Sequence, residues 1–436
     1  MIARGLGYRH YVLSALLLAY AFNFLDRQVL AIAMEAIKTD LSLTDTQLGL
    51  LNGIGFAAFY SILGIPIARW ADRGNRRLII SLSLGLLSAT VALCSAVTGF
   101  AQLVTVRMGV GVGEAGIVPP AHSLLAAYFP RPERLRAMSL FLLGGPLSMA
   151  AGYLLGGWIT QWAGWRSAFW AVAALGVFLT LLVALTVREP RLLPASMRVT
   201  RVTPAESVRL GTLMSTLWRQ PTFRNLLLAF LAEALCGNGL LQWIPVFFLR
   251  VHGMSTGELG TWLAVNWGLG NALGTLAGGY LTGRFMPEAE RFQLKIMMLI
   301  ACVYVPLNLA VLLLPATHVA LGVLFVGAFV NALASAPGYS LIQSLVPESM
   351  RATAVAAIFL VSNLIGLGFG PVIVGWLSDL LAGRYGAEGL RYALLCCAPG
   401  YLLVAACYRR ASRTVMSDIA EVEVRSCAPT LGISQP

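Results

Sequence analysis

The stretch Ala68-Arg69-Trp70-Ala71-Asp72-Arg73-Gly74-Asn75-Arg76-Arg77 is a short charged segment between two apolar runs, residues 47–68 and 78–98. Each run is close to the length of about 20 apolar residues that an α-helix needs to cross a bilayer. This part of the chain therefore predicts two membrane-spanning helices with a tight basic connection between them.

The same pattern extends over the whole chain of 436 residues, of which 58% are hydrophobic and only 11% charged. Because soluble globular proteins carry about 25% charged residues, a water-soluble enzyme is excluded. The spanning runs number twelve: 11–34, 47–68, 78–98, 101–122, 137–159, 166–187, 225–249, 258–281, 295–315, 319–343, 352–380 and 391–408. The first run is too long for a signal peptide and is interrupted by Asp26-Arg27, so we expect it to be retained. We predict an all-α membrane protein with twelve transmembrane helices.

Basic residues alternate between the two sides of this arrangement. With the N-terminus inside, 24 of the 31 basic residues fall on the inner side or in the tails, and five fall outside, namely Lys38, Arg166, Arg250, Arg384 and Arg391. The positive-inside rule then predicts that both termini are cytoplasmic. This topology explains the net charge of +12 without a nucleic-acid partner.

No motif indicates an enzyme, a metal site or a cofactor. The seven cysteines lie mostly in apolar runs without a CxxC pair, which is typical of packing residues. Gly111-Val112-Gly113-Glu114-Ala115-Gly116 matches GxGxxG, but it lies inside a spanning run rather than at a strand-to-helix turn. Glycines in a membrane helix instead allow close helix packing.

The two halves of the chain repeat each other. Pro132-Glu133-Arg134-Leu135-Arg136-Ala137 matches Pro347-Glu348-Ser349-Met350-Arg351-Ala352, with further matches on both sides in the same order. Parallel repeats of six helices are the architecture of transporters that alternate access to a site between the halves. We expect two six-helix bundles, at 1–187 and 225–408, joined by a cytoplasmic linker at 188–224 and followed by a cytoplasmic tail at 409–436.

At this point the chain resembles the major facilitator superfamily. That family carries G-x-x-x-D-R-x-G-R-R between its second and third spans, where this chain has residues 68–77, with Ala68 in place of the first glycine and Gly74-Asn75 inverted. A carboxylate beside several guanidinium groups can form charge-assisted pairs between helices. We expect Asp72, Arg73, Arg76 and Arg77 to form a gating latch, the alternative being a plain basic loop.

Four charged residues lie within the predicted spans of the first half. Asp26 and Arg27 are in the first span, and Arg107 and Glu114 are in the fourth. A charge at the centre of a spanning helix costs roughly 2.5–3.5 kcal/mol on insertion scales, so each needs a partner or a purpose. Arg107 and Glu114 are seven residues apart and share a helix face. We expect a mutually compensated group that binds substrate and protons, with Asp26 and Glu114 as the proton carriers; a purely structural ion-pair network is the alternative.

The second half is polar with few charges in its spans. The seventh span contains Glu233, an expected helix break at Gly237-Asn238-Gly239, and Gln242. We expect Asn238 and Gln242 to contact substrate, although amides at helix contacts also serve packing. Glu233 is either a second proton site or a solvated residue near the cytoplasmic end.

Within the superfamily, Asn23-Phe24-Leu25-Asp26-Arg27 together with Arg107, Glu114 and the prolines Pro119-Pro120 resembles the Spinster family. That resemblance implies transport of sphingosine-1-phosphate or lysophospholipids, and proton-linked transport in bacterial relatives. Only two lysines, Lys38 and Lys295, occur in the chain, so it resembles a bacterial homologue rather than an animal one, and we expect it in the inner membrane.

We therefore expect a monomeric, multi-pass, proton-coupled transporter that exchanges an amphiphilic or organic anion, such as a lysophospholipid, for protons. The amphiphile is consistent with an arginine pair that can bind an anionic head group. The alternative is a drug or small-metabolite proton antiporter of the same superfamily. The expected partners are membrane lipids, protons and the substrate.

Overall fold

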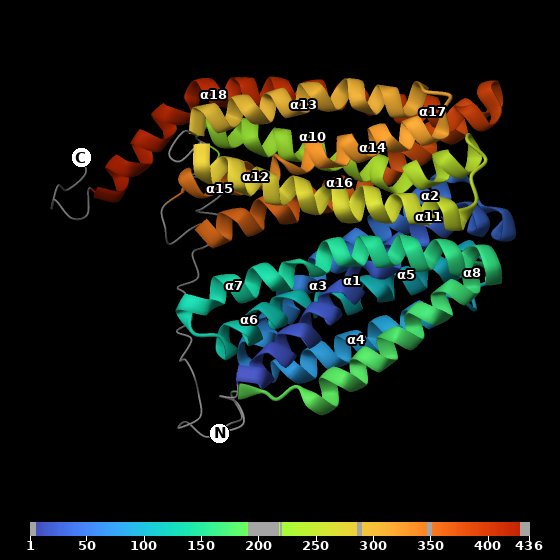
Figure 1. Cartoon of the computed structure of the whole chain (residues 1–436), viewed down its shortest axis with the longest axis horizontal. Helices are drawn as coiled ribbons and strands as arrows, with labels where there is room; N and C mark the ends of the chain where they lie inside the picture. Colours follow the sequence, from blue (N-terminus) through green and yellow to red (C-terminus); the bar gives the residue numbers. More distant parts are fainter. Residues whose placement is uncertain (1–5, 191–217, 219, 286–289, 347–350, 428–436) are drawn as a thin grey trace. The chain divides into compact units, whose positions relative to one another are not determined.

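The computed structural model describes residues 6–190, 218, 220–285, 290–346 and 351–427, and all regular elements among them are helices (Figure 1). The predicted all-α fold class is confirmed. Most of the predicted linker, and residues 347–350 of the second repeat motif, lie outside the described residues. At other helical positions, including Asp72 and Arg73, the side chain is not described either.

The first six predicted spans form helices with several short interruptions. In α8, Gly164 takes a φ of 80° and turns the chain between the fifth and sixth spans, a conformation that glycine adopts without steric cost. The helices are α1 (Leu6–Leu41), α2 (Asp45–Asn52), α3 (Ile54–Arg73), α4 (Arg76–Cys94), α5 (Phe100–Ala115), α6 (Val118–Tyr128), α7 (Arg131–Leu142) and α8 (Gly144–Thr186).

The charged segment between α3 and α4 is a helix stop followed by a helix start. The Gly74 N–H donates to the Trp70 carbonyl and ends α3, and the Asn75 side chain accepts a hydrogen bond from the Leu78 N–H at 3.1 Å. An N-cap asparagine satisfies one of the otherwise unpaired amides at a helix start. The order Gly74-Asn75, which departs from the family signature, therefore suits the local backbone.

Pro119 and Pro120 lack a backbone N–H and therefore predict from the sequence a kink just beyond Glu114, which the structure confirms. Helix α5 ends at Ala115, and α6 begins at Val118 with proline in its first turn. Proline is tolerated there because the first amides of a helix have no intrahelical acceptor. Glu114 thus lies in the last turn of α5.

The second half contains the remaining six predicted spans. A π-helical segment, η4, interrupts the eighth span. The elements are α10 (Pro221–Arg250), α11 (Thr256–Leu263), η4 (Ala264–Gly270), α12 (Asn271–Phe285), α13 (Glu290–Leu313), α14 (Thr317–Ala332), α15 (Ser335–Ser344), α16 (Arg351–Tyr385), the 3-10 turn η6 (Gly386–Glu388), α17 (Gly389–Leu395) and α18 (Ala398–Cys427).

The predicted helix break at Gly237-Asn238-Gly239 is wrong, because α10 is continuous through these residues. Each glycine costs a helix only about 1 kcal/mol, and close packing against α16 offsets this cost. A Cβ placed on Gly370 would lie 2.4 Å from the Leu235 carbonyl and 3.0 Å from the Gly239 nitrogen. Small residues on both helices therefore allow the two backbones to approach closely.

Within the described residues, seven helical segments are long and apolar enough to cross a membrane. Two of these segments are long enough to hold two predicted spans each. Several other predicted spans are divided into shorter helices by breaks such as those at Gly116 and in η4. The chain is thus a multi-pass membrane protein.

Close contacts divide the chain into two compact units. One comprises Met1–Pro204, Gln242–Leu269 and Pro371–Leu390, and the other comprises Ala205–Leu241, Gly270–Gly370 and Arg391–Pro436. The first unit thus draws residues from both halves of the sequence. The domain boundaries expected from the repeat stay a prediction.

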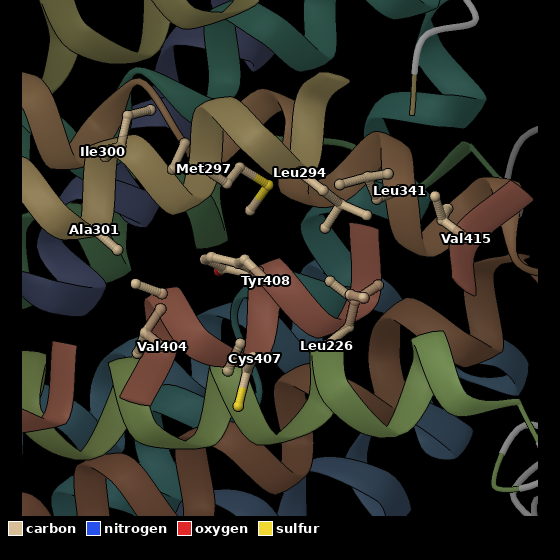
Figure 2. Packing of buried hydrophobic residues seen from close by; sticks show 14 of the residues in the cluster. Leu226, Leu294, Met297, Ile300, Ala301, Leu341, Val404, Cys407, Tyr408 and Val415 are labelled. Carbon is tan, nitrogen blue, oxygen red and sulfur yellow. The ribbon is translucent and has the colours of Figure 1, made fainter. Parts of the chain in front are cut away.

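The second unit has a core in which α13 and α18 run side by side with α10 (Figure 2). Tyr408 and Val415 of α18 pack with Met297 of α13 and Leu226 of α10, and all four are at most 1% exposed. This core determines which face of α18 is turned away from the protein interior.

Candidate functional site

Two buried ion pairs join α1 to α5. Arg107 Nη1 donates to Asp26 Oδ2 at 2.6 Å, and both side chains are at most 2% exposed. Arg27 Nε lies 3.2 and 3.1 Å from the two carboxylate oxygens of Glu114, which its Nη2 also contacts. The expected mutual compensation of these charges is confirmed. We call Asp26, Arg27, Arg107 and Glu114 the charged cluster.

Helix geometry explains why the four residues form two pairs. Arg107 and Glu114 are nearly two turns apart on one face of α5, about 10 Å along its axis. Asp26 and Arg27 are consecutive on α1, so their side chains leave the helix in directions about 100° apart. Each member of the α1 dipeptide therefore meets one of the two charged residues on α5.

Glycines on α5 allow its neighbours to approach closely. A Cβ on Gly111 would lie 3.0 Å from the Phe56 carbonyl of α3, and a Cβ on Gly113 would lie 2.8 Å from the Leu87 nitrogen of α4. The GxGxxG pattern therefore serves helix packing around Glu114.

Polar atoms remain without partners beside the Asp26–Arg107 pair. Among the described residues, Asp26 Oδ1, Arg107 Nε and both side-chain polar atoms of Asn23 are buried without a hydrogen-bond partner. Buried polar groups are normally paired, so such a concentration requires an explanation. Asp26 Oδ1 can bind a proton, and Arg107 Nε and the Asn23 amide can form hydrogen bonds with a polar group of a substrate.

In the part of the chain that the structure describes, Arg27 has three aromatic rings around its guanidinium group, whereas Arg107 has one, that of Phe56 at 5.6 Å. The Arg27 guanidinium carbon lies 4.4 Å from the ring centre of Phe56, 4.7 Å from that of Phe24 and 5.4 Å from that of Tyr60. Its side chain is 14% exposed, whereas that of Glu114 is fully buried. Cation–π contacts hold a guanidinium without neutralising it, so Arg27 can retain its position when its carboxylate partner is neutral.

The two amides on α10 that were predicted to contact substrate differ in their hydrogen bonding. Asn238 Nδ2 donates to the Ala234 carbonyl of its own helix at 2.8 Å. Gln242 is 4% exposed, and its Oε1 has no partner among the described residues. Their role in substrate binding stays a prediction.

Arg76 of the predicted latch is paired inside the first half. It binds Glu189, and each side chain is 1% exposed; its Nη1 also donates to the Ser123 carbonyl at 2.9 Å. Glu189 was not predicted from the sequence, because it follows the sixth span in what looks like an ordinary linker. Arg77 is half-buried, and the side chains of Asp72 and Arg73 lie outside the described residues, so the latch stays a prediction.

A second set of charges was missed by sequence reasoning. Arg250 at the end of α10 donates to Asp45 Oδ2 and to Glu35 Oε2, each at 2.8 Å. Asp45 also accepts from Lys38 Nζ and from Ser378 Oγ, each at 2.6 Å. We call Glu35, Lys38, Asp45, Arg250, Ser378 and Asp379 the outer network, because topology predicts this end of the helices outside.

Asp379 belongs to the outer network through the start of α2. Its carboxylate accepts from the Asp45 N–H at 3.0 Å and from the Thr46 N–H at 2.7 Å. An anion at a helix N-terminus satisfies unpaired amides and the helix dipole. The only signal in the sequence was that Lys38 and Arg250 are two of five basic residues on an otherwise acidic or neutral side.

Glu233 on α10 contacts an aromatic group. Tyr408 donates to its Oε2 at 3.2 Å, and Tyr304 and Tyr401 lie with ring centres 4.6 Å apart in the same unit. The role of Glu233 in proton coupling stays a prediction.

Comparisons with known proteins agree with this architecture. The family model described as "Major Facilitator Superfamily" matches residues 16–371. An MFS-type efflux pump of Mycolicibacterium smegmatis is 34% identical over 407 residues, covering 93% of each chain. A probable L-galactonate transporter of Escherichia coli is 27% identical, covering 88% of this chain and 84% of its own.

Among solved structures, a bacterial homologue of the human lysosomal transporter Spinster, in an inward-facing and occupied conformation, superposes with a TM-score of 0.82. It is 30% identical, and the match covers 94% of this chain and 98% of that one. The resemblance to Spinster proteins stated from Asp26, Arg27, Arg107 and Glu114 is confirmed.

Proposed function

The chain belongs to the Major Facilitator Superfamily, and we propose that it is a proton-coupled secondary active transporter of an amphiphilic or organic anion in the bacterial inner membrane. The observation that carries the proposal is the charged cluster, in which two carboxylates and two guanidinium groups are buried together. The net charge of the cluster determines whether it binds an anionic substrate.

With both carboxylates ionised, the charged cluster has no net charge. Burial favours the neutral form of a carboxylate and a neighbouring arginine favours the ionised form, so the two effects oppose each other. When Asp26 or Glu114 binds a proton, the cluster gains one positive charge. An anion is then the ligand that restores neutrality, and loss of the proton weakens its binding.

The arginines provide the group that recognises the anion. A guanidinium donates two parallel hydrogen bonds to a carboxylate or phosphate. Arg107 already has an unpaired Nε beside Asp26, and Arg27 is held by aromatic rings. Protonation of the paired carboxylate therefore frees a positioned donor for a substrate head group.

The outer network supports a role in alternating access. It joins α1 and α2 of the first half to α10 and α16 of the second through Arg250, Ser378 and Asp379. We infer that these contacts break when the outer side opens. Neutralising a residue of the network is then expected to favour opening to that side.

Uptake into liposomes of purified protein tests the function directly. The substrates are a lysophosphate lipid, sphingosine-1-phosphate, L-galactonate and a cationic dye, each with and without a pH gradient. We expect anion movement driven by the gradient, together with proton movement whose sign distinguishes exchange from joint transport. Gradient-driven transport of the dye without transport of any anion contradicts the proposal.

That contradicting result supports the alternative, a drug or small-metabolite proton antiporter. The similarity to an MFS-type efflux pump favours this alternative. The two functions differ in the charge of the substrate that Arg27 and Arg107 would meet. Substrate charge is therefore the property that the uptake series is chosen to vary.

A further inference from the structure

A groove lies on the second unit between α13 and α18. It has a volume of about 660 Å3 and is lined by Met298, Cys302, Leu402, Ala405, Ala406, Arg409, Arg410 and Arg413. The lining is apolar along most of its length and basic at one end. Its volume is within the range of about 300–1,000 Å3 typical of ligand sites.

The spacing along α18 places the basic residues on an outward face. Leu402, Ala406, Arg409 and Arg413 follow one another at intervals of three or four residues and therefore share a helix face. Leu402 is 54% exposed and the other three are also exposed. The core residues of α18, Tyr408 and Val415, belong instead to the buried cluster, in which Val415 lies beside Leu341 of α15 (Figure 2).

These arginines lack the partners that other arginines of the protein have. Within the described part of the chain, no carboxylate or carbonyl pairs with the guanidinium groups of Arg409, Arg410 or Arg413. Arg27, Arg76, Arg107 and Arg250, by contrast, all form ion pairs. The groove therefore has three positive charges available to a ligand.

The neighbouring helix extends the basic end. Arg291, Lys295 and Met298 of α13 are spaced by four and three residues, so they lie on the same face as the groove lining. Arg291 and Lys295 are exposed. The positive charge is thus presented by two adjacent helices at the end that topology predicts to be cytoplasmic.

We propose that this groove binds an anionic diacyl phospholipid of the inner leaflet, with its phosphate between Arg409, Arg410 and Arg413 and an acyl chain along the apolar lining. The outward face of a spanning helix is covered by lipid, so the apolar part of the groove suits a chain. Guanidinium groups bind phosphate in bidentate fashion, and basic pockets at the cytoplasmic side of helices bind acidic head groups. The proposal uses no residue of the charged cluster and does not depend on the transported substrate.

Native mass spectrometry of the full-length protein in detergent tests the proposal. The protein is titrated with phosphatidylglycerol and with phosphatidylcholine of the same acyl chains, with inorganic phosphate as a competitor. We expect phosphatidylglycerol to be retained and phosphatidylcholine to be lost, without displacement by millimolar phosphate. Equal retention of both lipids, or displacement by phosphate alone, overturns the proposal.

A charge variant and a matched control locate the site. Replacing Arg409, Arg410 and Arg413 by Gln is expected to lower the affinity for phosphatidylglycerol by about tenfold or more, since each basic residue contributes to head-group attraction. The control replaces Arg136, Arg224 and Arg284, which are exposed elsewhere, and has the same net charge. An equal loss in both variants overturns the proposal.

A second variant tests the apolar lining while all charges remain. Ala406→Trp fills the groove from its exposed side and is expected to lower phosphatidylglycerol affinity severalfold with an unchanged melting temperature. This variant decides the outcome if the triple substitution does not fold. Unchanged affinity overturns the assignment of the acyl chain to the groove.

Discussion

The charged cluster and the outer network are both sets of partly or fully buried charges, but they connect different parts of the chain. The cluster joins α1 to α5, both within the first 115 residues. The network joins residues as far as 334 positions apart, as in the contact of Asp45 with Asp379. The cluster is therefore internal to one repeat, whereas the network links segments from both.

This difference suggests a division of roles. Contacts internal to one repeat do not have to break when the repeats move, so the pairing within the cluster can respond to protonation and substrate binding alone. Contacts between segments from different repeats must change when those segments separate. We expect variants of the cluster to alter binding and coupling, and variants of the network to alter the population of states.

The largest expected effect is that of Arg107→Ala. Removing one partner of a buried pair costs about 3–5 kcal/mol, because the other charge is left uncompensated. Asp26 would remain buried with both oxygens unpaired, and anion uptake in liposomes is expected to be abolished. Arg107→Lys restores the charge without the bidentate fork and is expected to recover the melting temperature but little uptake. Normal uptake by Arg107→Ala contradicts the role of this residue.

Asp26→Asn is expected to separate binding from coupling. The amide keeps the shape of the carboxylate and can still accept from Arg107, but it cannot carry a proton. Substrate binding should persist while pH-driven transport and substrate-dependent proton flux are lost, with a milder loss for Glu114→Gln. Both quantities are measured in liposomes with a pH-sensitive dye inside.

The matched control for Asp26→Asn is Glu233→Gln, which changes a carboxylate that accepts from Tyr408. We expect its proton coupling to be intact. Undiminished proton flux in Asp26→Asn would show that the carrier lies elsewhere, with Glu233 as the next candidate.

Arg250→Gln is expected to act on the outer network alone. It removes charge-assisted hydrogen bonds to Glu35 and Asp45 worth about 1.5–3 kcal/mol each before compensation, while Lys38 and Ser378 still contact Asp45. A shift of about tenfold toward the outward-open state corresponds to 1.4 kcal/mol. Spin labels at the exposed positions Thr39 and Ala382, in a cysteine-free background, report the distance distribution.

Anion affinity should change little in Arg250→Gln, in contrast to Arg107→Ala. The matched control is Arg384→Gln, an exposed arginine whose described contact is with the Tyr385 ring. Identical distance distributions in Arg250→Gln and wild type contradict the role of the network in access.

The smallest expected effect is that of Asp72→Asn. The predicted latch closes the cytoplasmic side, so its loss should shift the population toward the inward-open state. Arg76 is already paired with Glu189, so we expect a shift smaller than that of Arg250→Gln. Spin labels at Leu135 and Phe285 measure it, and an unchanged distribution removes Asp72 from the latch.

The sequence was sufficient for the charged cluster because its members are conspicuous in their surroundings. Asp26, Arg27, Arg107 and Glu114 interrupt apolar runs, and insertion into a membrane penalises each of them unless it is paired. The spacing of Arg107 and Glu114 also placed them on one face. The kink after Glu114 followed in the same way from Pro119 and Pro120.

The outer network and Glu189 were not predictable in this way. A charged residue at the end of a spanning run is ordinary, so Glu35 and Asp45 carried no signal of their own, and Arg250 was conspicuous only as a basic residue on the outer side. The break expected at Gly237-Asn238-Gly239 does not form, because Gly370 packs closely against α10 and this packing stabilises a continuous helix. Tertiary contacts routinely override such local preferences.

The sequence by itself determined that this protein spans a membrane with helices and that the spans of its first half contain compensating charges. The physical reason is that burial of polar backbone and charge in lipid is so costly that it restricts local sequence directly. Only the tertiary structure decided which charges pair, that Arg250 bridges Glu35 and Asp45, and that Arg409, Arg410 and Arg413 line a groove with α13. These features depend on which helix faces meet, and contacts between residues distant in sequence leave no periodic pattern in the chain.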